Sequence, residues 1–312
     1  MESFLVCFRA VAPIFLIMAL GYLVQRTGAI SREDVPRLNK VAFRYFLSVT
    51  MFYNLYQSDI SHAIQPRLLL FAEIAVLAEF AVATVFVVAT ERERPKRGVK
   101  IQGIFRSNSI LIGIPLTAAL VEGADLGSIV LLLAVVVPTY NILAVVILEI
   151  FRGNRPNMGH VLLGIAKNPL IIAVALGLLF LLTPLRLPVV IESTISQIAP
   201  VSNAFMLFLL GAFFRFDGLR RYRWDLVVVT LGRLVVMPGI ILTIAYFLGF
   251  RGVEFAGLIA VFGSATAVSS FTMAQQLGGD DELAGDIVVV TSVFCIATLF
   301  GWSFLFKSLG AF

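Results

Sequence analysis

The apolar stretch PIFLIMALG, residues 13–21, returns half a chain later as PLIIAVALG, residues 169–177. A leading proline and a closing Ala-Leu-Gly recur at the same spacing, which argues against a chance similarity between two Leu- and Ala-rich helices. Each half of the chain contains five apolar runs, an odd number, so the second half must enter a membrane from the opposite side. The sequence therefore predicts an inverted repeat, an architecture typical of secondary transporters.

The ten apolar runs are each close to the length of about 20 residues that a helix needs to span a bilayer. They cover residues 4–25, 38–56, 68–90, 101–121, 127–151, 161–182, 195–214, 226–250, 253–277 and 284–306. We therefore predict an all-α membrane protein of ten transmembrane helices. Residues 1–156 form the first five-helix repeat, with the N-terminus outside, and residues 157–312 form the second, inverted repeat, with the C-terminus outside.

Bulk composition supports a lipid environment. Hydrophobic residues make up 59% of the chain and charged residues 14%, and the mean hydropathy is +0.97, whereas soluble domains carry about 25% charged residues. The net charge of +5 is spread over short runs between the apolar stretches, so nucleic-acid binding is not expected. Cys7 and Cys295 lie in apolar runs, and His62 and His160 lie in different loops, which argues against a disulfide framework, a metal site or another bound cofactor.

Orientation follows from the distribution of Lys and Arg, which collect in cytoplasmic loops. The odd-numbered loops and their flanks hold most of the basic residues, Arg106 among them, whereas the even-numbered loops contribute only Arg67, Arg186 and Arg251. We therefore expect the odd-numbered loops to be cytoplasmic. The ninth, residues 278–286, is acidic and is placed inside by parity alone.

Two runs contain signals for an interruption of the helix. In the fourth run, residues 106–115 (RSNSILIGIP) place Gly and Pro inside an apolar span, and Pro115 removes one helical N–H. In the ninth run, residues 263–270 (GSATAVSS) are small and hydroxyl-rich but contain no proline. We predict that helices 4 and 9 are broken and cross each other at mid-membrane, as in other inverted-repeat transporters.

A half-helix N-terminus inside a membrane presents unpaired N–H groups and about half a positive charge, which favours a carboxylate or another anion. Asn141 follows Pro138 in helix 5, where the proline frees a carbonyl group. The alternative is that the small residues only allow close helix packing. The predicted substrate-binding residues are Asn108, Ser109, Gly113, Ile114, Pro115, Asn141, Ser264, Thr266 and Ser269.

Four blocks of sequence resemble the auxin efflux carrier family, which includes the plant PIN proteins and bacterial malonate or malate transporters. They are residues 105–116 (FRSN…GIPL), 137–143 (VPTYNIL), 167–170 (KNPL) and 266–274 (TAVSSFTMA). The resemblance extends over nearly the whole chain and implies a scaffold domain, a transport domain with crossing helices 4 and 9, and export or exchange of organic acids. The chain departs from the family pattern at Ala265, where relatives often have proline.

Glu79 lies near the centre of the third run. A carboxylate in hydrocarbon costs at least a few kcal/mol, so it usually faces a cavity or a partner and marks function. We hypothesise that Glu79 couples protons to transport; the alternative is a protonated Glu bonded to a neighbouring helix. Arg233 and Glu149 lie near the predicted cytoplasmic interface, where snorkelling explains both.

These features predict a secondary carrier, by efflux or exchange, for a small organic anion such as a carboxylate or dicarboxylate, with alternating access at the crossing of helices 4 and 9. The coupling ion is left open between H⁺ and Na⁺. Alternatives are a sodium-coupled symporter of the bile-acid-transporter type and an anion channel. An enzyme is not expected, because the spans contain no paired Asp or paired His. We expect a multi-pass protein of a cell membrane, specifically a bacterial inner membrane, with a homodimer as one alternative for its oligomeric state.

Overall fold

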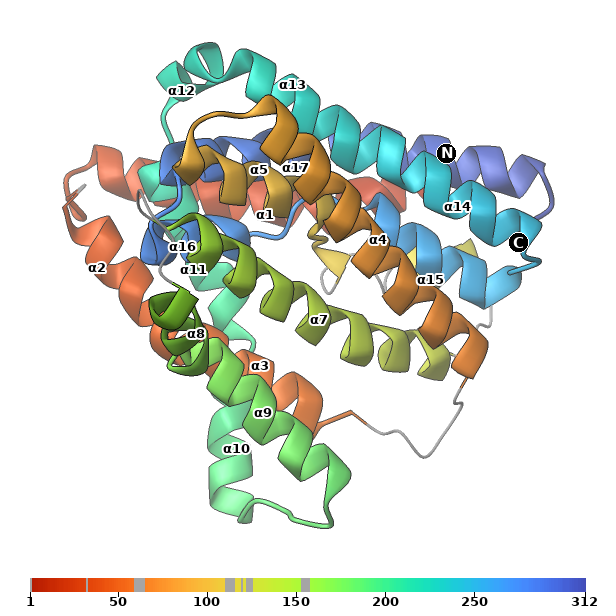
Figure 1. Cartoon of the computed structure of the whole chain (residues 1–312), viewed down its shortest axis with the longest axis horizontal. Helices are drawn as coiled ribbons and strands as arrows, with labels where there is room; N and C mark the ends of the chain where they lie inside the picture. Colours follow the sequence, from red (N-terminus) through yellow and green to blue (C-terminus); the bar gives the residue numbers. More distant parts are fainter. Residues whose placement is uncertain are drawn as a thin grey trace.

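The computed structural model describes residues 2–31, 33–58, 65–109, 116–118, 120–121, 126–152 and 158–312. Within this part of the chain the regular elements are helices, joined by one isolated β-bridge (Figure 1). The elements of the first half are α1 (Glu2–Arg26), α2 (Asp34–Val41), the π-helix η1 (Ala42–Leu47), α3 (Ser48–Tyr56), α4 (Pro66–Thr90), α5 (Arg94–Phe105) and α7 (Gly127–Phe151). Those of the second half are α8 (Met158–Ala166), α9 (Pro169–Leu182), α10 (Val189–Ile198), α11 (Val201–Phe213), α12 (Phe216–Arg221), α13 (Arg223–Leu231), the π-helix η2 (Gly232–Val236), α14 (Met237–Phe247), α15 (Gly252–Gly263), α16 (Ser269–Leu277) and α17 (Asp281–Ser308).

Five continuous helical segments of the described residues are long and apolar enough to cross a membrane. They are Pro66–Thr90, Gly127–Phe151, Val189–Phe213, Arg223–Phe247 and Asp281–Ser308. Three shorter apolar helices, Ala12–Arg26, Pro169–Leu182 and Gly252–Gly263, add to them. The chain is therefore an all-helical multi-pass membrane protein, while the count of ten spans stays a prediction.

Helix α4 illustrates how sequence spacing decides which face is buried. Its buried residues recur every three or four positions, as one face of an α-helix requires: Leu68, Ala72, Ala75, Val76, Glu79, Ala83 and Val87. The opposite face exposes large apolar side chains, among them Leu70, Ile74, Val82 and Val85. An apolar outer face is stable in lipid. Glu79 is the one fully buried charged residue of α4 and points into the protein.

The two copies of the repeated stretch make equivalent packing contacts. α1 packs against α11, and α9 packs against α3. A Cβ at Gly21 would lie 1.9 Å from the backbone oxygen of Phe208 in α11, and one at Gly177 would lie 2.8 Å from the Cβ of Leu55 in α3. Both repeat glycines thus allow two helices to approach closely. Small residues commonly have this role at helix interfaces in membranes.

The predicted fourth and ninth runs do not coincide with single continuous helices. α5 begins at Arg94, seven positions before run 101–121, and ends at Phe105, whereas run 253–277 contains α15 and α16 with residues 264–268 between them. α5, α15 and α16 are the most enclosed elements, and every residue from Phe255 to Gly263 is buried. In Figure 1 they lie among α4, α7 and α17, which cover them.

Candidate functional site

The ends of α5 and α15 meet at the centre of the molecule, where two extended segments pair. Ser107 and Thr266 form an antiparallel β-bridge, and the Asn108 backbone N–H donates to the Ala265 carbonyl at 2.8 Å. The Thr266 hydroxyl donates to the Gly103 carbonyl at 2.8 Å. Backbone groups freed by the ends of the helices are therefore satisfied by the partner segment, which buried peptide groups require.

This pairing forms although Ala265 stands where a proline would force a break. The chain leaves helical geometry at Ser264, whose φ and ψ are −73° and 158°, and α16 restarts at Ser269. On the other segment Arg106 is extended, with φ and ψ of −85° and 127°. Tertiary hydrogen bonds between the two segments replace the helical ones, so a proline is not needed at residue 265.

Arg106 is the central side chain of this site, and only 2% of its surface is exposed. Its guanidinium donates to Asn141 Oδ1 at 2.5 Å, Ser269 Oγ at 2.6 Å and Ser270 Oγ at 3.4 Å, and lies 2.8 Å from Met273 Sδ. Among the described residues, no carboxylate forms a salt bridge with it. A buried ion without a counter-charge carries a desolvation penalty of several kcal/mol, and a negative charge beside Arg106 would offset part of that penalty.

A cavity of about 30 Å³ adjoins Arg106, which is room for about two water molecules. Its walls come from α3, α5, α7, α11 and α16 with the residues next to them: Leu47, Thr50, Met51, Arg106, Ser107, Asn108, Val137, Tyr140, Asn141, Asn203, Ala267, Val268 and Ser269. The N-terminus of α16 lies at this wall and adds about half a positive charge. The buried Asn108 Nδ2 has no hydrogen-bond partner among the described atoms, so a donor is left for a ligand.

A second cavity of about 280 Å³ shares Met51 and Val137 with the first. It is lined by Met51, Asn54, Gln57, Ser58, Val130, Leu133, Ala134, Val137 and Pro138. Asn54, Gln57 and Ser58 lie at the end of α3, towards the loop predicted to be outside. The larger cavity therefore adjoins the Arg106 cavity, towards that loop.

Arg233 is completely buried, which corrects the expectation of a snorkelling side chain at the interface. It lies in the π-helix η2 and donates to Phe105 O at 3.0 Å, Val261 O at 3.1 Å and Ser264 O at 2.9 Å. Its Nη1 also lies 3.6 Å from Oε1 of the buried Glu79. Glu149 is likewise buried rather than snorkelling, and forms a salt bridge with the exposed Arg152 at 3.3 Å.

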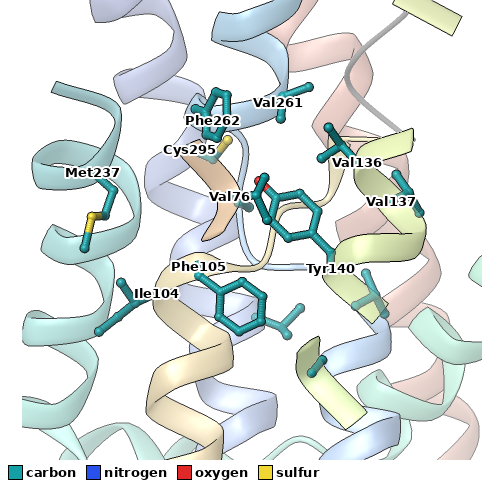
Figure 2. Packing of buried hydrophobic residues seen from close by; sticks show 14 of the residues in the cluster. Val76, Ile104, Phe105, Val136, Val137, Tyr140, Met237, Val261, Phe262 and Cys295 are labelled. Carbon is teal, nitrogen blue, oxygen red and sulfur yellow. The ribbon is translucent and has the colours of Figure 1, made fainter. Parts of the chain in front are cut away.

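Figure 2 shows the apolar wall of this region, with Phe105 of α5 beside Tyr140 of α7. Their ring centroids are 5.9 Å apart. The Tyr140 ring extends towards the paired segments in this view, between Val76 and Val136, and its buried hydroxyl group lies close to Arg233 and Glu79. Tyr140 lines the Arg106 cavity, and both rings belong to the buried apolar core.

The predicted site residues fall into three groups. Asn108, Asn141 and Ser269 line the Arg106 cavity. Thr266 and Ser264 lie behind it in the paired segment, where the Ser264 hydroxyl donates to the Ala260 carbonyl, and Ser109 is fully buried outside the cavity lining. Gly113, Ile114 and Pro115 lie outside the described residues.

Two functional candidates, Arg106 and Arg233, were missed by sequence reasoning. Charge counting places Arg106 among the basic residues of a cytoplasmic loop and Arg233 at the membrane interface. The sequence does contain one signal for Arg106, which is its position two residues before Asn108, itself a predicted site residue. Among the described residues, no group of three or more His, Cys, Asp or Glu side chains is arranged to hold a metal ion.

Comparison with known proteins gives two matches. A family model described as "Membrane transport protein" matches residues 6–159 and 155–303. A protein of Methanothermobacter thermautotrophicus described as an "Uncharacterized transporter" is 23% identical over 300 residues, which cover 95% of this chain and 97% of that protein. Both matches extend over nearly the whole chain, including the paired segments around Arg106.

Proposed function

Because this chain belongs to the membrane transport protein family, that of the auxin efflux carriers whose motifs it carries, we propose that it is a secondary carrier of a small organic anion. The substrate class is a carboxylate or dicarboxylate, moved by efflux or exchange across a cell membrane. Membership of a transporter family and several apolar helices support this function over an enzyme.

The observation that carries the proposal is the unmatched charge of Arg106. Its guanidinium is buried beside a cavity, in contact with neutral acceptors and without an acidic partner among the described residues. A carboxylate of the substrate would provide the counter-charge and form charge-assisted hydrogen bonds, for which the planar fork of Arg is suited. Asn108 and the N-terminus of α16 would add donors on the same wall.

Several paired features support an inverted-repeat mechanism of alternating access. α1 packs on α11 as α9 packs on α3, and α5 contacts α17 as α15 contacts α7. The extended segment after α5 and the one between α15 and α16 are bridged to each other at Ser107 and Thr266. We infer that the paired segments are the interruptions of helices 4 and 9 in two inverted five-helix repeats. In this mechanism helices 4 and 9 rock relative to the remaining helices and expose Arg106 to each side of the membrane in turn.

A sodium-coupled symporter needs clustered oxygens that are free to ligate the ion. At the crossing, the carbonyl oxygens of Phe105, Val261 and Ser264 already accept hydrogen bonds from Arg233. These contacts favour a carrier without sodium at this position.

The function is tested with purified protein in two steps. A thermal-shift screen against small organic acids identifies a ligand, and proteoliposomes loaded with that acid are then assayed for uptake of the labelled compound. We expect saturable uptake and counterflow, in which unlabelled internal acid accelerates entry of the labelled acid. Conductance without saturation or counterflow would instead identify a channel, and uptake that requires sodium would identify the symporter.

Glu79→Gln tests proton coupling. We expect the wild type to respond to an imposed pH gradient, because the Glu79 carboxyl group is buried and neither of its oxygens forms a hydrogen bond with the described residues. The Gln variant is nearly isosteric and cannot exchange a proton, so its exchange of anion should persist while its response to the gradient disappears. The measurement is uptake at several external pH values. A variant that keeps the wild-type pH dependence would rule out the role of Glu79.

A further inference from the structure

We propose that Arg233 is a tethered cation that holds the C-terminal ends of α5 and α15 together, in place of a bound metal ion, so that the crossing assembles without one. This inference rests on the proposed carrier function and addresses how its binding site is positioned. Arg233 is then a positioning residue, distinct from Arg106, which faces the cavity.

The geometry is that of a cation bound by carbonyl oxygens. Arg233 donates from Nη1 to Phe105 O at 3.0 Å and Ile104 O at 3.4 Å, which are the last residues of α5. It donates from Nε to Ser264 O at 2.9 Å and from Nη2 to Val261 O at 3.1 Å, at the end of α15. All three guanidinium nitrogens are used, and they reach both helices.

A charge balance explains why a cation is needed there. The C-terminus of a helix carries roughly half a negative charge, so two converging ends carry roughly one. Arg233 provides one positive charge, which matches the two ends without help from Glu79. Glu79 Oε1 lies 3.6 Å from Arg233 Nη1, and its charge is not needed for this balance.

The local fold of helix η2–α14 directs Arg233 to this position. Residues Gly232–Val236 form a π-helix, which inserts an extra residue into the turn and re-aims the side chains that follow. Gly232 lies against α5, since a Cβ there would be 3.4 Å from Ile104 Cγ1. This contact places η2 beside the end of α5, where Arg233 reaches the carbonyls of that helix.

The first test is chemical rescue of Arg233→Ala, which leaves a cavity of guanidinium size beside the unpaired carbonyls. We expect anion uptake to fall by about tenfold or more, because several buried charge-assisted hydrogen bonds are lost. Millimolar free guanidinium should restore part of the uptake and raise the apparent melting temperature, whereas equal concentrations of sodium or potassium chloride control for ionic strength. A folded variant that does not respond to guanidinium would overturn the proposal.

The double variant Glu79→Gln/Arg233→Met separates this role from simple neutralisation of Glu79. If Arg233 only balanced that carboxylate, removing both charges would restore transport. We expect the double variant to stay impaired, since the carbonyl ends of α5 and α15 still lack their cation. Wild-type uptake by the double variant would contradict the proposal.

Arg233→Lys covers the case in which the other variants do not fold. It keeps the charge but loses the fork that reaches both helices, so we expect lower uptake and a lower melting temperature, and wild-type values for both would overturn the proposal. The thermal measurements need no transport. If the wild type shows no saturable anion uptake while guanidinium still stabilises Arg233→Ala, the carrier function fails and the tethered cation stands.

Discussion

Arg106→Met is expected to weaken binding of the organic anion by about 100-fold or more, because hydrogen bonds to charged groups are each worth about 1.5–3 kcal/mol and an Arg–carboxylate pair makes two of them. The measurement is ligand affinity by thermal shift or calorimetry on purified protein, with uptake in proteoliposomes as a second readout. Arg106→Lys keeps the charge without the planar fork and should be intermediate.

A stability measurement distinguishes this role from a structural one. Removing a buried charge that has no counter-ion relieves its desolvation penalty, so the ligand-free Arg106→Met protein should melt at the same or a higher temperature than the wild type. Arg220→Met removes the same charge from an exposed position on α12 and should leave affinity unchanged. If Arg106→Met lowered the melting temperature and kept full affinity, Arg106 would be structural and the proposed site would be wrong.

Gly211→Ala is expected to lower the apparent melting temperature by about 5–10 °C, since overpacking costs about 1–3 kcal/mol or more and each kcal/mol shifts melting by about 2–4 °C. A Cβ at Gly211 would lie 1.9 Å from the Met18 carbonyl oxygen and 2.6 Å from its carbon. These are backbone atoms, which cannot rotate away, so α1 and α11 would have to separate. Gly21→Ala should act similarly, because its Cβ would lie 1.9 Å from Phe208 O.

The matched control for this substitution is Gly301→Ala. Gly301 lies inside α17, and a Cβ there would meet no atom within 4 Å. Ala favours a helix over Gly by about 1 kcal/mol, so this variant should be as stable as the wild type or slightly more stable. Thermal unfolding in detergent, followed by the loss of the monodisperse peak, measures all three variants. Equal melting of Gly211→Ala and Gly301→Ala would show that the α1–α11 contact contributes little.

Family membership and the helical membrane class could be predicted from the sequence, because both depend on local signals. Apolar runs reflect the solvent that surrounds the chain, and the motifs around Asn108 and Thr266 are contiguous in sequence. The repeated glycines Gly21 and Gly177 are visible in the sequence as a pattern, and the structure shows that each allows a close approach between two helices. The inverted arrangement of ten spans and the substrate class stay predictions.

The roles of the two buried arginines were decided by the tertiary structure alone. Charge counting treats each Lys or Arg as a mark of a cytoplasmic loop, which is correct on average but takes no account of a partner from elsewhere in the chain. Arg106 meets Asn141 from α7 and Ser269 from α16, and Arg233 meets carbonyls of α5 and α15. A buried guanidinium is stable only where several acceptors converge. Each of these acceptors lies 28–163 residues away from its arginine in the sequence, so no local pattern could reveal the contact.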